Sequence, residues 1–555
     1  MTVVSEGMRC VLVLALLAAC GGDDSSATGP ITAHVTHYDY TFDLDTQAAH
    51  AKVDLVADVA GNCVTVPFRA AGFVNAVFDG EPALAAQADG ANATICGHGV
   101  DATKAFTIES DQSVETKTLS TSQVGYSITQ DGEGHAFHYL VSWVNGCDRF
   151  GPCDARPDQF ATYTFHVTHS DPTMMVRCAG DITETSPTET ECNFDHPGGP
   201  TYSTFGIAAY PAWTQTDKGS WGGVHVTVYD RASTGIAAAI DPAFHDGFLA
   251  WMQSELGPYP FGTELRVLTA PTYWSGFEHP GNIILDDGLA KQVGGYLHPV
   301  QHVLDHEMTH MWAGDQTTLA STYDFVWKES MAEYLSFVWE DMNDVTTSHV
   351  TSGVWKTDAA PARYYPVPLD KPELFTYYGD VYGPGPMVLF RQLEVMTSRA
   401  QVLAAIKSVL GTPHALSVDD LLAALSRETG LDLAQYAQAW IKGSGVPNWP
   451  QLALTYMPGS LQIHQTNPNP TPQGCKFHVV LRGANAGEMT SVMVDTFNNG
   501  VEQTVLFPTP AYTVTALDLD PDHECLVFKY SSTPRTAPPV QPWVAPRFAD
   551  PTRDR

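Results

Sequence analysis

The chain has 555 residues, several times the length of an ordinary domain, so we expect two to four domains and at least one large hydrophobic core. Its 28 basic and 62 acidic residues give a formal net charge of −34, which repels a phosphate backbone and argues against nucleic acid as a partner. Solubility or a salty environment is the simplest explanation of this acidity.

Residues 1–30 are predicted to be a signal and tether. Arg9 precedes an apolar run from Val11 to Leu17, which is too short to span a bilayer and leads through two alanines to Cys20. This pattern resembles a bacterial lipoprotein signal, whose cysteine is lipidated and becomes N-terminal after cleavage. The resemblance implies a protein exported and anchored by Cys20 to a bacterial membrane, on its periplasmic or cell-surface side. An ordinary cleaved secretory signal is the alternative.

The texture of the sequence then changes three times. Residues 31–205 alternate apolar and polar residues in short runs, which predicts an N-terminal antiparallel β domain. Residues 206–447 begin with a strand pattern and continue as long helical patterns at 241–256, 299–313, 323–338, 384–397 and 417–426, which predicts a mixed, mainly helical domain. Alternation returns over residues 448–532 and predicts a small β domain, and the Pro-rich residues 533–555 are expected to be disordered.

Eight cysteines remain once the leader is removed, an even number that suits the oxidising conditions met by an exported protein. They fall along the chain as successive neighbours, and we expect these neighbours to pair. The expected disulfides are Cys63–Cys96, Cys147–Cys153, Cys178–Cys192 and Cys475–Cys525. A zinc site made of cysteines is disfavoured, because no two cysteines have the CxxC spacing.

One predicted helix, from Pro299 to the break at Gly314, contains His306-Glu307-Met308-Thr309-His310. Side chains four residues apart project from one helix face, so both imidazoles can bind a single ion. Glu329 follows on the next predicted helix after eighteen intervening residues. A His/His/Glu set leaves the fourth tetrahedral position for water, so the sequence predicts one catalytic Zn²⁺ per chain.

The positions of Glu307 and His302 on the same predicted helix indicate what each side chain does near the metal. Glu307 lies next to a ligand but points along a different azimuth, which places it beside the bound water as the general base. His302 lies one turn earlier on the ligand face. We expect it to support or pack against the site, because a fourth protein ligand would close the position that the water needs.

These motifs resemble the aminopeptidase N family of gluzincin metallopeptidases, in which HExxH is followed by Trp and Gly and then by an acidic ligand after a Trp. His310-Met311-Trp312-Ala313-Gly314 and Trp327-Lys328-Glu329 match, with the second tryptophan one place nearer the glutamate. Weaker matches extend the resemblance over about residues 35–450. The implied fold is multidomain α+β: an N-terminal antiparallel β-sandwich or saddle domain, a thermolysin-like catalytic domain and a small C-terminal β-sandwich.

The resemblance also assigns substrate-binding and catalytic positions. The family's Gly-x-Met-Glu-Asn stretch, whose glutamate binds the free amino terminus of the substrate, corresponds to Gly276-Phe277-Glu278-His279, so Gly276 and Glu278 are the expected substrate-binding residues. The family's catalytic tyrosine corresponds to Tyr382, where a phenol would stabilise an oxyanion, with Tyr377 and Tyr378 as nearby competitors.

The expected function is a zinc aminopeptidase that removes N-terminal residues from peptides with a free amino terminus. One alternative is a zinc metallohydrolase that is not an aminopeptidase, such as an endopeptidase. Another, from a different class, is a surface-anchored binding protein with an idle zinc site. The presence of both Glu307 and Tyr382 argues against that second alternative, since a decayed enzyme does not need either residue.

Overall fold

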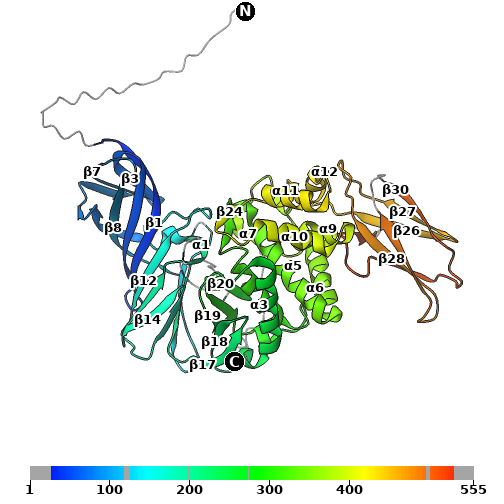
Figure 1. Ribbon diagram of the computed structural model, residues 1–555, viewed down its shortest axis with the longest axis horizontal. Coiled ribbons are helices and arrows are strands. Elements are labelled where there is room, and N and C mark those ends of the chain that lie inside the picture. The colour runs from blue at the N-terminus through cyan, green and yellow to red at the C-terminus, as the bar shows by residue number, and fades with distance from the viewer. Residues whose placement is uncertain are drawn as a thin grey trace, which may run out of the picture.

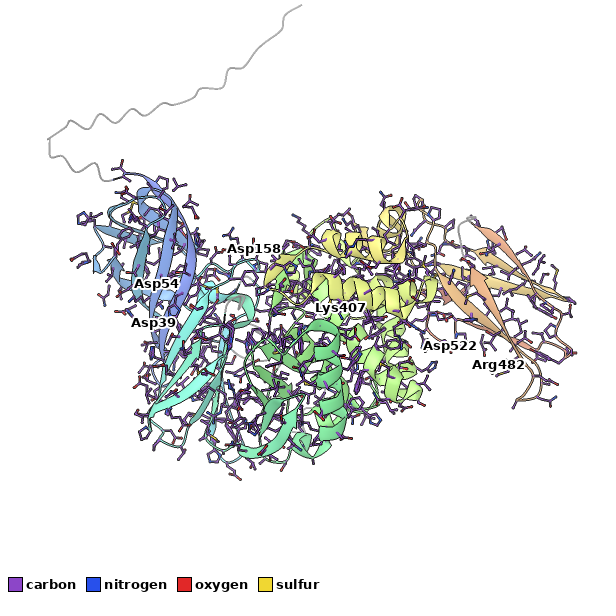
Figure 2. The ribbon with its side chains drawn as sticks, in the orientation of Figure 1. Asp39, Asp54, Asp158, Lys407, Arg482 and Asp522 are labelled. Atoms are coloured by element: carbon purple, nitrogen blue, oxygen red, sulfur yellow. A yellow bond between two sulfur atoms is a disulfide. The ribbon has the colours of Figure 1, made fainter. Side chains whose placement is uncertain are left out.

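The computed structural model describes residues 27–117, 125–144, 146–196, 201–204, 206–272, 274–495 and 501–530. The predicted anchor Cys20 and the predicted disordered tail lie outside these residues. A β region at one end, a mainly helical middle and a second β region at the other end follow one another along the long axis (Figure 1). Charged side chains such as Asp54 and Lys407 lie on the outside of these regions (Figure 2). This is the multidomain α+β architecture that the sequence predicts.

The N-terminal β region contains an 11-stranded sheet and a 5-stranded sheet. The strands of the larger sheet are β1 (Pro30–Asp43), β2 (Ala48–Val59), β3 (Gly61–Pro67), β4 (Ala71–Phe78), β5 (Glu81–Pro82), β6 (Ala85–Ala88), β7 (Asn92–Val100), β8 (Ala105–Ser113), β12 (Thr162–Thr168), β14 (Asp181–Ser186) and β15 (Glu189–Phe194). Buried and less buried residues alternate along β2, as expected for a sheet with one face on the core. Most strand pairs of this sheet are antiparallel, as predicted, but β1 pairs in parallel with both β12 and β3.

The 5-stranded sheet of this region has the order β13-β16-β11-β10-β9. Its strands are β9 (Thr116–Lys117), β10 (Gly125–Gln130), β11 (Ala136–Val141), β13 (Met175–Cys178) and β16 (Gly206–Tyr210). Three of the expected disulfides lie in the N-terminal region: Cys63–Cys96, Cys147–Cys153 and Cys178–Cys192. The first joins β3 to β7 within one sheet, whereas the third joins β13 to β15 and so ties the two sheets to each other.

A second 5-stranded sheet supports the middle region, with the order β17-β18-β19-β21-β20. Its strands are β17 (Thr214–Trp221), β18 (Val224–Asp230), β19 (Glu264–Ala270), β20 (Gly276–His279) and β21 (Asn282–Asp286). β18, β19 and β21 are parallel, and the edge strand β20 runs antiparallel to β21. β20 therefore presents Gly276 and Glu278 at the edge of the sheet.

Helices make up most of the rest of the middle region (Figure 1). Two short strand pairs lie among them, β22 (Thr317–Leu319) with β24 (His414–Leu416) and β23 (Val367–Pro368) with β25 (Lys442–Gly443). They are α2 (Ile236–Ala239), α3 (Pro242–Leu256), α4 (Pro299–His310), α5 (Phe325–Asn343), α6 (Val345–Ala359), α7 (Leu374–Tyr378), α8 (Pro384–Pro386), α9 (Gln392–Met396), α10 (Arg399–Val409), α11 (Val418–Thr429) and α12 (Ala434–Tyr436), with the four-residue α1 (Thr201–Thr204) before the sheet. The helix expected over 384–397 is interrupted by a π-helical turn at Met387–Arg391. Among the residues that the structure describes, no helix has the length and apolar character needed to cross a membrane.

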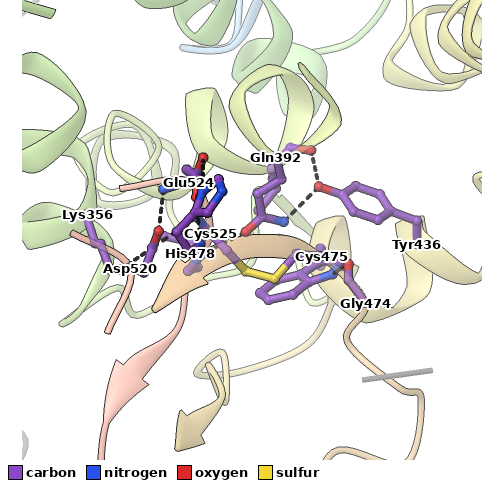
Figure 3. The surroundings of a disulfide bond; sticks show 12 residues. Lys356, Gln392, Tyr436, Gly474, Cys475, His478, Asp520, Glu524 and Cys525 are labelled. Carbon is purple, nitrogen blue, oxygen red and sulfur yellow. Dashed lines mark hydrogen bonds and ion pairs between the residues drawn. A yellow bond between two sulfur atoms is a disulfide. The ribbon is translucent and has the colours of Figure 1, made fainter. Parts of the chain in front are cut away.

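The C-terminal region consists of two small sheets, with orders β30-β27-β26-β32 and β29-β28-β31. The strands are β26 (Gln451–Met457), β27 (Ser460–Gln465), β28 (Lys476–Arg482), β29 (Met489–Asp495), β30 (Glu502–Leu506), β31 (Ala516–Leu519) and β32 (Phe528–Lys529). The fourth expected disulfide, Cys475–Cys525, lies where this region meets the helices, close to Gln392 and Tyr436 (Figure 3). The domain limits derived from the sequence stay predictions.

Candidate metal centre

Three predicted ligands meet between α4 and α5. His306 and His310 lie one turn apart on α4, and Glu329 lies on α5. The His306 and His310 Nε2 atoms are 3.0 Å apart, and they lie 3.2 and 3.5 Å from Glu329 Oε2. A tetrahedral zinc ion with bonds of about 2.0–2.1 Å separates its ligand atoms by roughly 3.3–3.4 Å. The spacing and the nitrogen and oxygen chemistry of this buried set therefore fit Zn²⁺.

Both imidazoles are oriented to present the same nitrogen. His310 Nδ1 lies 3.0 Å from the carbonyl oxygen of Ala313, which can only accept, so Nδ1 carries the hydrogen and the Nε2 lone pair is left for a metal. His306 Nδ1 lies at ion-pair distance, 3.2 Å, from Glu333 Oε1, without a hydrogen bond between them. Both Nε2 atoms face Glu329 Oε2 between the helices, and the Lys328 ammonium lies 3.3 Å from His310 Nε2.

Glu333 is the centre of a buried network behind His306. Its carboxylate accepts hydrogen bonds from Trp355 Nε1, at 2.7 Å, and from the Tyr296 hydroxyl, at 3.1 Å. His302 bridges Glu333 and Glu340, with Nε2 3.1 Å from the first carboxylate and Nδ1 2.8 Å from the second. Although burial lowers the pKa of His302, Glu340 and Glu333 raise it to about 9, so this histidine is positively charged.

His302 therefore lies where its spacing placed it, behind the ligands and away from the three converging atoms. Glu333 and Glu340 were missed by sequence reasoning. They follow Glu329 by four and eleven residues, spacings that put all three carboxylates on one face of α5. That periodicity is the signal that could have found them. The pairing of His302 with residues far along α5, and of His310 with its start, also shows that α4 and α5 run antiparallel.

Glu307 lies beside the ligand set and is almost fully buried, at 5 % exposure. Gly276 on β20 packs directly against it, because a Cβ at Gly276 would overlap the Glu307 carboxyl group. Burial, with the negative charges of Glu278 and Glu329, raises the pKa of Glu307 to about 8 against the lowering effects of His306 and Lys328. A divalent cation at the three ligands would favour the ionised form. The predicted base and the predicted substrate-binding glycine are thus in contact.

Glu278 enters the same space from β20. Ligand atoms of Glu278, Glu307 and His310 all lie within 4.8 Å of one another, so the predicted amine-binding carboxylate is next to the metal ligands. Lys328, the residue before Glu329, has its Nζ 2.9 Å from Glu278 Oε1. His279 does not join the site: it is buried, and its Nδ1 donates to the carbonyl oxygen of Ser203.

The two competitors of the predicted catalytic Tyr382 use their hydroxyl groups elsewhere. Tyr377 donates to the carbonyl oxygen of Pro366, and Tyr378 donates to that of Thr322. Both phenols are therefore used to hold loops together. The ring of Tyr382 lies 6.4 Å from the ring of His306, and burial together with the carboxylates around it, Glu329 first, raises the pKa of its hydroxyl well above the ordinary value. Tyr382 stays protonated and can donate.

Fold and donor set together are similar to those of gluzincin-type zinc metallopeptidases, with an HExxH helix, a glutamate on the next helix and a carboxylate beside the candidate ligands. Residues 257–440 match the peptidase family M1 domain. The matched residues include the whole candidate ligand set of His306, His310 and Glu329. No curated protein sequence matches the chain.

Solved structures extend the similarity beyond the matched domain. The chain is similar to an M1 zinc metallopeptidase from Deinococcus radiodurans, with a TM-score of 0.60 and 18% identity over 75% of this chain and 95% of that one. A mutant of the Deinococcus radiodurans enzyme bound to a tyrosine-serine-alanine substrate gives a TM-score of 0.61 at 18% identity, over 75% and 95% of the two chains. A two-domain M1 zinc metallopeptidase mutant bound to L-tryptophan gives 0.61 at 19%, over 75% and 96%. These structures share the fold of this chain.

Proposed function

We propose that the protein is a zinc-dependent aminopeptidase that releases N-terminal residues from peptides. The observation that carries the proposal is the convergence of His306, His310 and Glu329 next to Glu307, with Glu278 at the adjacent sheet edge. Zinc at the three ligands supplies Lewis-acid chemistry, lowering the pKa of a water to about 7 and polarising a carbonyl group. His306, His310 and Glu329 would hold the ion.

Each remaining side chain has one task. Glu307 accepts the proton of the attacking water and passes it to the leaving amine, which a carboxylate in contact distance of both can do. Tyr382 donates a hydrogen bond to the oxygen on which negative charge develops when the carbonyl is attacked. Glu278 pairs with the ammonium of the substrate and so sets the distance from the amino terminus to the cleaved bond.

The test is a panel of aminoacyl reporters and short peptides, incubated with the purified protein, with a chelator, and with the chelator followed by zinc. We expect stepwise release of single N-terminal residues, loss of activity with chelator and recovery with zinc. Mass spectrometry of the products separates the alternatives. Internal fragments without free N-terminal residues indicate an endopeptidase, and bound zinc without any turnover indicates a binding protein.

We also propose that Cys20 carries a lipid and holds the enzyme on the outer side of a bacterial membrane. The support is the leader pattern of the sequence and the oxidised state of all eight remaining cysteines. A Cys20→Ser variant is expected to appear in the soluble exported fraction and to lose labelling by a fatty-acid probe. Unchanged membrane association of that variant contradicts the anchor.

A further inference from the structure

Lys328 is a buried cation held by two carboxylates at the metal centre. Its side chain is almost fully shielded from solvent, at 2 % exposure. The Nζ atom lies 2.9 Å from Glu278 Oε1, 2.7 Å from Glu329 Oε1 and 3.3 Å from His310 Nε2. It also lies above the ring of Phe325, 5.4 Å from its centre. One ammonium group is therefore shared by the proposed amine-binding carboxylate and by a proposed metal ligand.

Lys328 cannot easily move away when substrate arrives. It contacts Oε1 of Glu329, whereas Oε2 is the oxygen that lies 3.2 and 3.5 Å from the two imidazole Nε2 atoms. The lysine thus leaves Oε2 as the ligating oxygen and keeps the carboxylate in its orientation. Displacing it would break its contacts with both Glu278 and Glu329 inside a buried site, which is costly in a low-dielectric environment.

The same contact changes what Glu278 can offer to a substrate. A carboxylate with a free negative charge attracts an ammonium, but Glu278 already has an ammonium at ion-pair distance. An incoming charged amino terminus has to share the carboxylate and lie close to Lys328, where two like charges repel each other. A neutral, blocked amino terminus meets neither the attraction nor the repulsion. The net preference for a free amine is therefore small.

We propose that Lys328 is a specificity-determining residue that stands in for the substrate ammonium at Glu278, so that the enzyme accepts peptides with a neutral, blocked N-terminus nearly as well as peptides with a free one. This inference rests on the proposed function, because it concerns the same site and the same reaction, and it revises one part of it: Glu278 is shared by the substrate ammonium and Lys328 and does not select for that ammonium. It names the substrate class more closely: peptides cleaved near the N-terminus whether or not that terminus carries a charge.

The first test needs no variant. For matched free and N-acetylated aminoacyl reporters, the ratio of kcat/KM values in the wild-type protein is expected to be below about tenfold, because the single charge-assisted bond that separates them is largely cancelled. A ratio above about 100-fold, which a full charge-assisted bond gives, overturns the inference. This measurement also holds if a substituted protein does not fold.

The second test removes the internal charge. Lys328→Gln is expected to raise the ratio of free to acetylated substrate by about 10- to 100-fold, because Glu278 then has no other cation. Lys328→Arg keeps a cation and is expected to raise the ratio much less. Lys356→Gln is the matched control, since Lys356 is a partly buried lysine paired with Asp520 at the junction with the C-terminal region, and it should leave the ratio unchanged. An unchanged ratio in Lys328→Gln overturns the inference.

Binding without turnover gives an independent readout. In a Glu307→Gln background, calorimetric titration with leucyl-glycine and with its N-acetyl form should show nearly equal affinities with Lys328 present and tighter binding of the free dipeptide with Lys328→Gln. Zinc content is measured for each variant to confirm that the ligands are intact. Failure of the proposed function has a different signature, namely no release of N-terminal residues by the wild-type protein. If only this inference is wrong, the wild-type protein still releases N-terminal residues, and Lys328→Gln leaves the affinities for the free and the acetylated dipeptide unchanged.

Discussion

Within the described part of the chain, histidine and carboxylate side chains satisfy the spacing of a metal site in two places, the metal centre and the junction with the C-terminal sheets, and the two clusters are built differently. At the junction between the helices and the C-terminal sheets, ligand atoms of His478, Asp522 and Glu524 lie within 4.8 Å of one another, as those of the metal centre do. There, however, Glu524 accepts from the backbone N–H of His478 at 2.8 Å and from its ring at 2.9 Å (Figure 3). Asp522 is exposed.

At the junction, the oxygens of the neighbouring carboxylate Asp520 are also taken up by hydrogen bonds from the protein itself. Asp520 accepts the backbone N–H groups of Glu524 and Cys525, at 2.8 and 3.1 Å, and pairs with Lys356. At the metal centre, by contrast, the lone pairs of two imidazoles and one carboxylate converge, and the outer nitrogens are held by Ala313 and Glu333. Residue types and spacing alone do not distinguish the two clusters, but the partners of their nitrogen and oxygen atoms do. We therefore expect the junction cluster to contribute to stability and the metal centre to contribute to turnover.

The largest effect is expected at the metal centre. Glu307→Gln removes the proton acceptor while keeping shape and hydrogen-bonding length, and kcat should fall by about 10²- to 10⁴-fold. Thermal stability and zinc content, measured by scanning calorimetry and elemental analysis, should stay close to the wild-type values. Full activity in this variant would refute Glu307 as the base.

The junction offers the corresponding test of stability. Cys475 and Cys525 close a loop with a sequence separation of 50 residues at the point where the C-terminal sheets join the helices. Replacing both with serine should lower the free energy of unfolding by about 4 kcal/mol, from the loop entropy of the unfolded chain. Denaturant titration measures the change. Activity per folded molecule should be unaffected, and a loss of activity in the folded variant would mean that the two clusters are coupled.

The sequence was sufficient to predict the metal ligands, because two of them lie one turn apart on a single helix. His306 and His310 come together because a spacing of four residues puts them on one helix face, and Glu329 because the next helix returns antiparallel. What the sequence did not reveal is the far side of the same helix pair. Glu333 and Glu340 act through His302, and pairing between helices depends on a packing register that no single-helix pattern encodes.

Lys328 shows a second limit. The sequence pattern Trp327-Lys328-Glu329 identifies the ligand Glu329 but assigns no role to the lysine before it. Its importance depends on Glu278 lying on a sheet edge fifty residues earlier in the chain, which only the tertiary structure reveals. The same holds for the parallel pairs of β1 with β3 and β12, since alternation predicts a strand and one buried face but not the direction of its neighbours.

A smaller loss of stability is expected from Lys356→Gln at the junction. Lys356 is 12 % exposed and its partner Asp520 is fully buried, so removal of the lysine leaves a buried carboxylate that still has two backbone N–H donors. Because those donors compensate in part, the free energy of unfolding should fall by about 2 kcal/mol, below the usual 3–5 kcal/mol for a broken buried pair. Chemical denaturation checks this value, and an unchanged midpoint would show that the pair adds nothing to the junction.

The smallest predicted effect is on zinc affinity. It compares two carboxylates, one in each cluster, that contact a histidine without being proposed as metal ligands. Glu333→Gln removes the charge that orients His306 through Nδ1, while a glutamine can still accept from Trp355. Zinc affinity, measured by competition with a chelator, should fall by about 10- to 100-fold, as is usual for the outer partner of a ligating histidine. Glu524→Gln at the junction is the matched control, since it touches His478 in a similar way but should leave zinc affinity unchanged. Equal zinc affinities in wild type and Glu333→Gln would mean that His306 is oriented by helix packing alone, and the contrast between the two clusters would then reduce to the three ligands themselves.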